Sequence, residues 1–136
     1  MEWYLKVVKE NYANFNGRAR RKEYWMFTLI NTLIIFGLAI FVGLLADTNA
    51  VYFPAIILGL YVLGVFIPNL AVTVRRFHDT GKSGWYYLLS LIPYVGGLIL
   101  IIMMAQNGDT GTNQYGPDPK APDNDEINEI GKPILD

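Results

Sequence analysis

Three long stretches of this chain carry no charged residue, and they limit the folds that are open to it. They cover about residues 24–46, 52–74 and 85–105. A helix of roughly 23 residues rises about 34 Å, enough to cross a hydrocarbon core of about 30 Å with some tilt. The sequence therefore predicts an all-α integral membrane protein in which each stretch forms a transmembrane helix.

The composition supports this fold class. Apolar residues make up 52% of the 136 residues and charged residues only 17%, and the charges gather at the N-terminus, in the loop 75–84 and in the C-terminal tail. This uneven distribution is typical of a chain whose solvent is lipid. We expect one membrane domain over residues 1–119, followed by a flexible, disordered acidic tail over 120–136.

Residues 1–16 are predicted to form an amphipathic helix that lies in the membrane interface. At 100° per residue, its apolar side chains fall in one sector: Tyr4, Leu5, Val7, Val8, Tyr12 and Phe15. Charged side chains occupy the opposite sector, and Asn16-Gly17 ends the helix with residues that tolerate left-handed geometry.

The distribution of lysine and arginine predicts an orientation. Six of the 11 fall in the first 22 residues and three in the loop 75–84, whereas the link around Asp47 has none. The positive-inside rule then places the N-terminus and this loop in the cytoplasm, and three crossings place the tail outside. One alternative stays open, because Pro93 and Gly96-Gly97 could break the third span into a re-entrant hairpin that returns the tail to the cytoplasm.

Three short motifs together resemble a known family. They are FNGR at 15–18 with EYW at 23–25, RRFHDTGKSGW at 75–85, and GTNQYGPDP at 111–119. In content, order and spacing they are similar to the domain of unknown function 805 family, small bacterial inner-membrane proteins of the YhaH and YhaI type. The resemblance implies a bacterial cytoplasmic membrane location and a helical transmembrane domain. It implies no activity, substrate or cofactor, and residues 120–136 lie beyond it.

Two strings in the loop 75–84 imitate catalytic motifs. Gly81-Lys82-Ser83 lacks the glycine that a phosphate-binding loop needs five residues before Gly81, where Arg76 stands. His78 with Ser83 could form a nucleophilic pair, but no separate group is placed to orient the imidazole. With no cysteine and one histidine, we also expect no metal site and no cofactor.

The triplet Asp-Thr-Gly occurs at 79–81 and again at 109–111. Aspartic proteases use two such triplets, whose carboxylates share one proton. Three crossings would place these triplets on opposite sides of the bilayer, so we interpret them as turns. We therefore predict a protein that is not an enzyme.

The preferred function is that of a non-enzymatic component whose basic cytoplasmic face binds membrane lipids with anionic headgroups or a protein partner. Each exposed cation there attracts anionic lipid by about 1 kcal/mol, and Arg20 or Arg21 could pair with Asp79. Nucleic acid is not an expected partner, because the patch is short and held against the bilayer. The candidate contact residues are Arg18, Arg20, Arg21, Lys22, Arg75, Arg76, His78, Asp79 and Lys82.

Polar residues inside the predicted spans suggest an alternative. Asn31, Asn69 and Ser90 lie in the cytoplasmic half and should face the interior, either as contacts between helices or as a polar pocket for transport. Against transport, the spans contain no ionisable Asp, Glu, Lys, Arg or His. A homo-oligomer could use the small-residue pairs Ala39 with Gly43 and Ala55 with Gly59.

Overall fold

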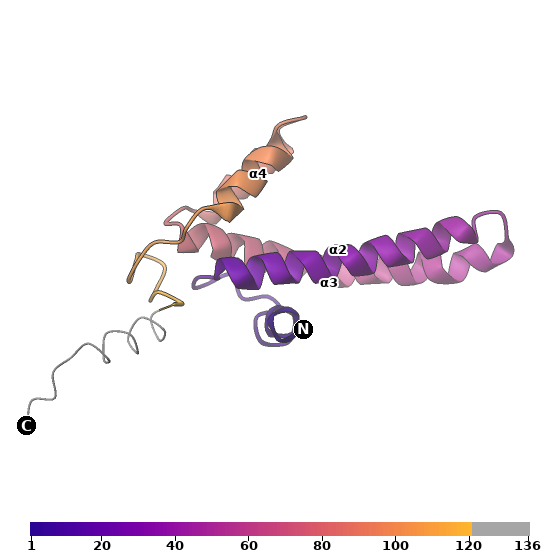
Figure 1. Ribbon diagram of the computed structural model, residues 1–136, viewed down its shortest axis with the longest axis horizontal. Helices are drawn as coiled ribbons and strands as arrows, with labels where there is room; N and C mark the ends of the chain where they lie inside the picture. Colours follow the sequence, from indigo (N-terminus) through magenta and orange to yellow (C-terminus); the bar gives the residue numbers. More distant parts are fainter. Residues whose placement is uncertain (121–136) are drawn as a thin grey trace, which may run out of the picture. The chain divides into compact units, whose positions relative to one another are not determined.

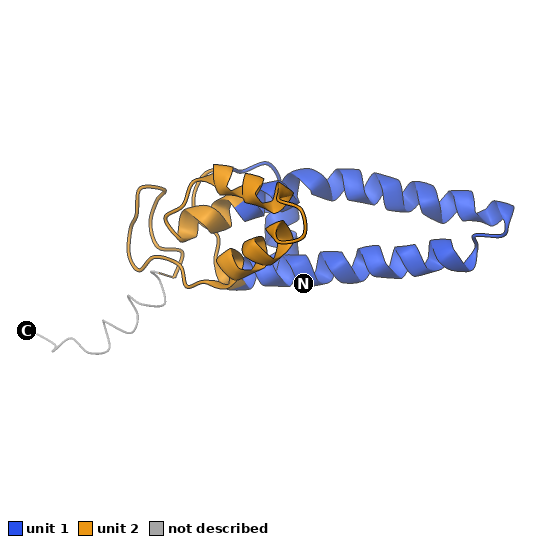
Figure 2. Ribbon diagram, turned by 90° about the horizontal axis from the view of Figure 1, so that it is seen from above, with its two compact units in different colours: residues 1–15, 22–73 blue, residues 16–21, 74–136 orange. Residues whose placement is uncertain are grey.

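The computed structural model describes residues 1–120, and the predicted acidic tail lies outside the described residues from 121 onward. The regular secondary structure of the described residues is helical, apart from one isolated bridge between Asn113 and Gly116, and residues 11–20 and 106–120 are irregular. It divides into two compact units, residues 1–15 with 22–73 and residues 16–21 with 74 onward (Figure 2). The elements are α1 (Glu2–Leu5), η1 (Lys6–Glu10), α2 (Arg21–Leu44), η2 (Asn49–Val51), α3 (Tyr52–Asp79), η3 (Gly84–Leu91) and α4 (Gly96–Ala105).

The first two uncharged stretches form the long helices α2 and α3, which run antiparallel and are joined by a short link (Figure 1). Both are long and apolar enough to span a membrane. Only 6% and 11% of their most apolar windows are buried within the protein, which distinguishes them from the core helices of a soluble protein. Their exposed leucine, isoleucine and phenylalanine side chains suit a lipid environment.

The third uncharged stretch is not one helix, so the prediction of a continuous span over 85–105 is wrong. It forms the 3₁₀-helix η3 and the ten-residue α4, separated by four residues. Pro93 lacks an N–H and holds the preceding Ile92 extended, at ψ 121°, while Tyr94 adopts a positive φ of 68°. A Cβ on Gly96 would lie 2.5 Å from the Ser90 carbonyl oxygen, so the two arms approach closely only because residue 96 is glycine.

The N-terminal helix is shorter than predicted. It comprises α1 and the π-helical η1 and ends at Glu10, so the predicted helical structure over 11–16 is wrong. Its predicted apolar face is confirmed in part as a packing face. Val7 is fully buried, and the Tyr4 ring stacks on Phe27 of α2 with centroids 5.5 Å apart.

Tyr12 repairs a gap in the hydrogen bonding of α3. Pro68 lies inside this helix and has no N–H, so the carbonyl of Gly64, four residues earlier, loses its usual donor. The Tyr12 hydroxyl donates to that carbonyl at 2.6 Å. An unsatisfied carbonyl in a membrane helix is costly, because lipid offers no donor. The N-terminal segment therefore completes the helix that it packs against.

This arrangement predicts that Tyr12→Phe destabilises the protein by about 1 kcal/mol. Pro68→Ala provides the matched background, because alanine restores the N–H that bonds the Gly64 carbonyl within the helix. In that background Tyr12→Phe should cost much less. Unfolding in detergent micelles, analysed as a double-mutant cycle, measures the coupling, and an equal cost in both backgrounds would contradict the assignment.

Candidate functional site

The buried carboxylate of Asp79, at the end of α3, is held by two arginines. Arg18 Nε and Nη2 both lie 2.9 Å from its Oδ1, and Arg76 Nη1 donates to its Oδ2. The side chains of the three residues are 2% exposed or less. Two guanidinium groups on one carboxylate compensate its loss of hydration, and they leave the triad with a net charge of +1.

The same two arginines also bind main-chain carbonyls of the last turn of α4 and of the segment that follows it. Arg18 donates to the carbonyls of Asp109, Gly111 (2.5 Å) and Gly116 (3.4 Å). Arg76 donates to those of Met104 (3.1 Å) and Gln106. Cations at the C-terminal end of α4 also interact favourably with its helix dipole. The arginines thus supply the donors that regular secondary structure would otherwise provide for this irregular segment.

These bonds contradict the predicted position of the tail. Residues 106–118 were expected across the membrane from the loop 75–84, but the Asp109 N–H donates to the Asp79 carbonyl at 2.6 Å. Lys82 Nζ likewise donates to Gln106 Oε1 at 3.2 Å. The chain therefore leaves and re-enters the same polar cluster on either side of the segment 84–105.

The two Asp-Thr-Gly triplets are neighbours, contrary to the expectation that the bilayer separates them. They do not reproduce a protease dyad. Both oxygens of Asp79 accept from arginines, whereas Asp109 Oδ2 accepts from Asn113 Nδ2 at 3.1 Å. A dyad needs one proton shared between two carboxylates, whereas these two carboxylates bond separate partners.

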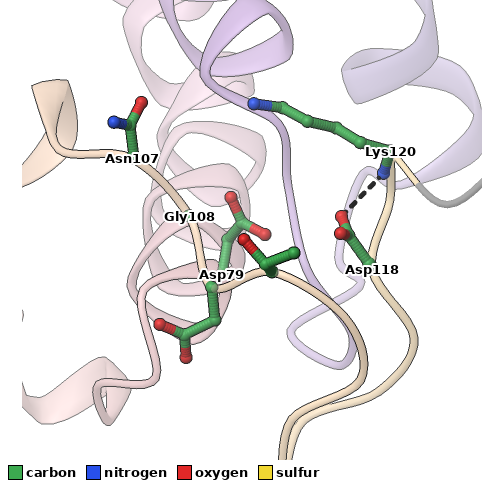
Figure 3. Close-up of a pocket in the computed structure, with 7 residues that line it drawn as sticks. Asp79, Asn107, Gly108, Asp118 and Lys120 are labelled. Atoms are coloured by element: carbon green, nitrogen blue, oxygen red, sulfur yellow. Dashed lines mark hydrogen bonds between the residues drawn. The ribbon is translucent and has the colours of Figure 1, made fainter. Parts of the chain in front are cut away.

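A polar cavity of about 300 Å³ lies beside this cluster (Figure 3). Gly108 allows the close approach, because a Cβ there would lie 2.0 Å from Asp79 Oδ2. Asp118 accepts from the N–H groups of Gly111 at 3.0 Å and Lys120 at 2.9 Å. Burial raises the pKa of Asp118, but these hydrogen bonds and nearby Arg18 outweigh it and lower the pKa below its usual value. The cavity is lined by Asp79, Asn107, Gly108, Asp109, Thr110, Asp118 and Lys120.

The His78 ring is held by an aromatic ring and a main-chain carbonyl. Its ring stacks on Tyr115, with centroids 4.0 Å apart and planes 4° apart, and its Nδ1 lies 3.0 Å from the Gly17 carbonyl. Ser83 Oγ accepts from the Trp85 N–H at 3.3 Å and caps η3. The two side chains thus have different local partners. Among residues 1–120, no group of three or more His, Cys, Asp or Glu side chains could hold a metal ion.

The predicted pairing of polar residues inside the spans is only partly found. Asn31 accepts from the Tyr61 hydroxyl at 2.9 Å, and that hydroxyl bonds the Tyr4 hydroxyl, also at 2.9 Å. Asn69 is exposed, so the prediction that it faces the interior is wrong. Ser90 bonds locally to the Tyr87 carbonyl at 2.7 Å.

The predicted basic face separates into buried and exposed members. Arg18, Arg75, Arg76 and Asp79 are buried. His78, Arg20 and Lys82 are intermediate, and Arg21 and Lys22 are exposed. The partner of Asp79 is also corrected, since Arg18 and Arg76 take the place predicted for Arg20 or Arg21. Sequence reasoning missed Asn113, Tyr115 and Asp118, although the motif at 111–119 contains all three.

Two long lipid-compatible helices and a polar cluster that ties the flanking loops together define a small helical membrane protein. All three motifs noted in the sequence contribute to that cluster, through Arg18, through Arg76 and Asp79, and through the segment after Asp109. The family model described as "Protein of unknown function (DUF805)" matches residues 12–117. The chain belongs to this family.

Relatives of known cellular location are inner-membrane proteins. The inner membrane protein YhaH of Escherichia coli strain K12 is 49% identical over 120 residues, which cover 88% of this chain and 98% of YhaH. The inner membrane protein YhaI of the same strain is 46% identical, with 88% and 97% covered. YiiR of that strain is 29% identical, with 82% and 90% covered. No solved structure matches the chain.

The triad predicts that Asp79→Asn destabilises the protein by about 3–5 kcal/mol, because two buried guanidinium groups lose their counter-charge. Asp109→Asn is the matched control: it neutralises an exposed carboxylate of the same cavity and should cost about 1 kcal/mol or less. Denaturant unfolding in detergent measures both. Similar losses for the two variants would show that the triad does not hold the cluster.

His78 is the only histidine in the chain, so its ring can be titrated without assignment ambiguity. It lies beyond the uncharged stretch 52–74, and burial lowers its pKa below 6.5 while the bond to Gly17 partly opposes this. The unfolded chain then binds more protons, so stability should fall as pH drops from about 6.5 through the folded pKa. Ring carbon–proton NMR in micelles tests this, and a midpoint at or above 6.5 would refute it.

Proposed function

We propose that this inner-membrane protein is a non-enzymatic component that binds anionic lipid headgroups with the basic residues left exposed on its cytoplasmic face. The positive-inside bias supports that orientation for the N-terminus and the loop 75–84. Against chemistry, the Asp79 carboxylate is fully engaged, and His78 and Ser83 have separate structural partners.

One observation carries the proposal. The ammonium groups of Lys6 and Lys22 lie 5.4 and 5.5 Å from the centre of the same Trp3 ring. Lys22 is exposed at the start of α2, and the Lys6 side chain is 43% exposed. An indole with two cations beside it is suited to the headgroup region, where the ring tolerates both lipid and water and the cations meet lipid phosphates.

The charges at this place are only partly neutralised within the protein. The Lys6 ammonium lies 3.9 Å from the buried carboxylate of Glu23, and the Lys6 side chain is also 43% exposed to solvent. Lys22 has no comparable carboxylate contact among the ion pairs of residues 1–120. By contrast, Arg18 and Arg76 are buried in the triad. We therefore assign the lipid-binding role to Lys6 and Lys22 beside Trp3.

The proposal predicts that Lys22→Gln and Lys6→Gln each lower the preference for anionic over zwitterionic lipid. A contribution of about 1 kcal/mol per cation corresponds to about a fivefold loss. Lys120→Gln is the charge-matched control, because Lys120 lies outside the Trp3 cluster, and it should leave the preference unchanged. Electron spin resonance of headgroup-specific spin-labelled lipids in reconstituted membranes measures the ratio.

Two outcomes would refute this function. Unchanged selectivity in the Lys6→Gln, Lys22→Gln double variant would remove the Trp3 cluster as a lipid site. A selectivity that does not weaken with added salt would show that the attraction is not electrostatic, because exposed charges are screened within about 8–10 Å at physiological ionic strength.

A further inference from the structure

The hairpin of η3 and α4 is the part of the molecule that the lipid-binding proposal does not use. No charged residue occurs between Lys82 and Asp109. The apolar side chains of the hairpin point outward around both arms, and only Gly96 and Met104 of α4 are buried. Its exposed large residues are Trp85, Tyr86, Leu88, Leu91, Ile92, Tyr94, Val95, Leu98, Ile101 and Ile102.

Both ends of this hairpin are fixed at one polar cluster. Lys82, just before η3, bonds Gln106, just after α4, at 3.2 Å. Arg76 holds the Met104 carbonyl at 3.1 Å. The hairpin therefore has a charged base and an apolar far end, at which Tyr94 is fully exposed.

The two arms have nearly equal reach. The eight residues of η3 rise about 16 Å at the 3₁₀ spacing, and the ten of α4 rise about 15 Å at the α spacing. Each is close to half of a hydrocarbon core of about 30 Å. Neither arm alone crosses a bilayer, but the length of each arm matches the depth of one leaflet.

Three N–H groups of the turn between the arms are hydrogen-bonded within the hairpin, which lowers the cost of placing the turn in hydrocarbon. The Ile92 N–H donates to the Leu89 carbonyl at 3.2 Å and the Gly96 N–H to the Ile92 carbonyl at 2.9 Å. The Val95 N–H donates to the Pro93 carbonyl at 2.8 Å, and Pro93 has no N–H to satisfy.

Aromatic residues support the same direction of insertion. Trp85, Tyr86 and Tyr87 follow one another at the base of the hairpin, next to the charged cluster. Tryptophan and tyrosine favour the headgroup level, with apolar residues beyond them. An apolar surface around both arms, rather than on one face, fits lipid better than the single groove of a protein partner.

We infer that the segment Gly84–Ala105 is a re-entrant hairpin that inserts into a single leaflet, on the membrane side that holds the Asp79 cluster. Each arm reaches through the depth of that leaflet, and residues 106–120 return to the side from which the hairpin entered. The inference does not depend on any headgroup preference.

Single-cysteine labelling of the full chain tests the topology, because the natural sequence has no cysteine. Asn49→Cys, Tyr94→Cys and Thr112→Cys would be treated with a membrane-impermeant maleimide in spheroplasts and in inverted vesicles. We expect residues 49 and 112 to be labelled from opposite sides, and residue 94 from neither side before detergent is added. Labelling of 49 and 112 from one side, or of 94 from the aqueous phase, would overturn the inference.

Spin labels can distinguish a hairpin that is surrounded by lipid from one that is covered by a protein partner. In liposomes of the purified protein, a label at residue 94 should collide with oxygen far more than with an aqueous nickel complex. Leu98→Cys, on the exposed arm of α4, is the second position in case the Tyr94 substitution disturbs the turn, and it should show the same excess at a shallower depth. Exclusion of both reagents at both positions would indicate a protein partner and overturn insertion into lipid.

Discussion

The ion pairs of the buried Asp79 carboxylate with Arg18 and Arg76 are the interactions on which the compact unit of residues 16–21 and 74 onward depends. Arg18 directs its Nε, Nη1 and Nη2 groups to Asp79 and to three further carbonyls, and Arg76 does the same with four acceptors. A guanidinium offers five donors in a fixed plane, so it can order an irregular chain that no helix or sheet supports. Without the carboxylate, two buried cations would face each other across a few ångströms, and the segment after α4 would lose its donors.

The long helices were predictable because a membrane helix has a simple requirement, an uninterrupted apolar length. The stretches 24–46 and 52–74 correspond to α2 and α3, and α3 simply continues to Asp79 because nothing before Gly81 interrupts it. The third stretch satisfied the same length criterion, yet it is a hairpin. Hydropathy measures only the length of an apolar stretch and does not show whether the chain reverses within it. Pro93 and the close approach at Gly96 allow the chain to reverse here.

The sequence predicted which segments form the site, but it did not predict which donor bonds which acceptor. The three motifs contain its residues, but the acceptors of Arg18 and Arg76 are mostly main-chain carbonyls, which every residue carries and no sequence pattern reveals. The same limit applied inside the membrane. Asn31 bonds Tyr61 and not Asn69. The sequence did not reveal this partner, because a tyrosine in an apolar helix can serve as an apolar packing residue or as a hydrogen-bonding residue.

Counting lysine and arginine near a membrane therefore overstates the charge available to lipid. The loop 75–84 and the N-terminal flank look equally basic in the sequence, but burial removes Arg18, Arg75 and Arg76 from the surface. The charges of Arg18 and Arg76 stabilise the fold, since moving these side chains into water would leave Asp79 unpaired in a buried site. Among the cations that stay accessible, Lys6 and Lys22 lie beside the Trp3 ring. A positive-inside pattern thus combines two physical roles, and only the burial of each cation separates them.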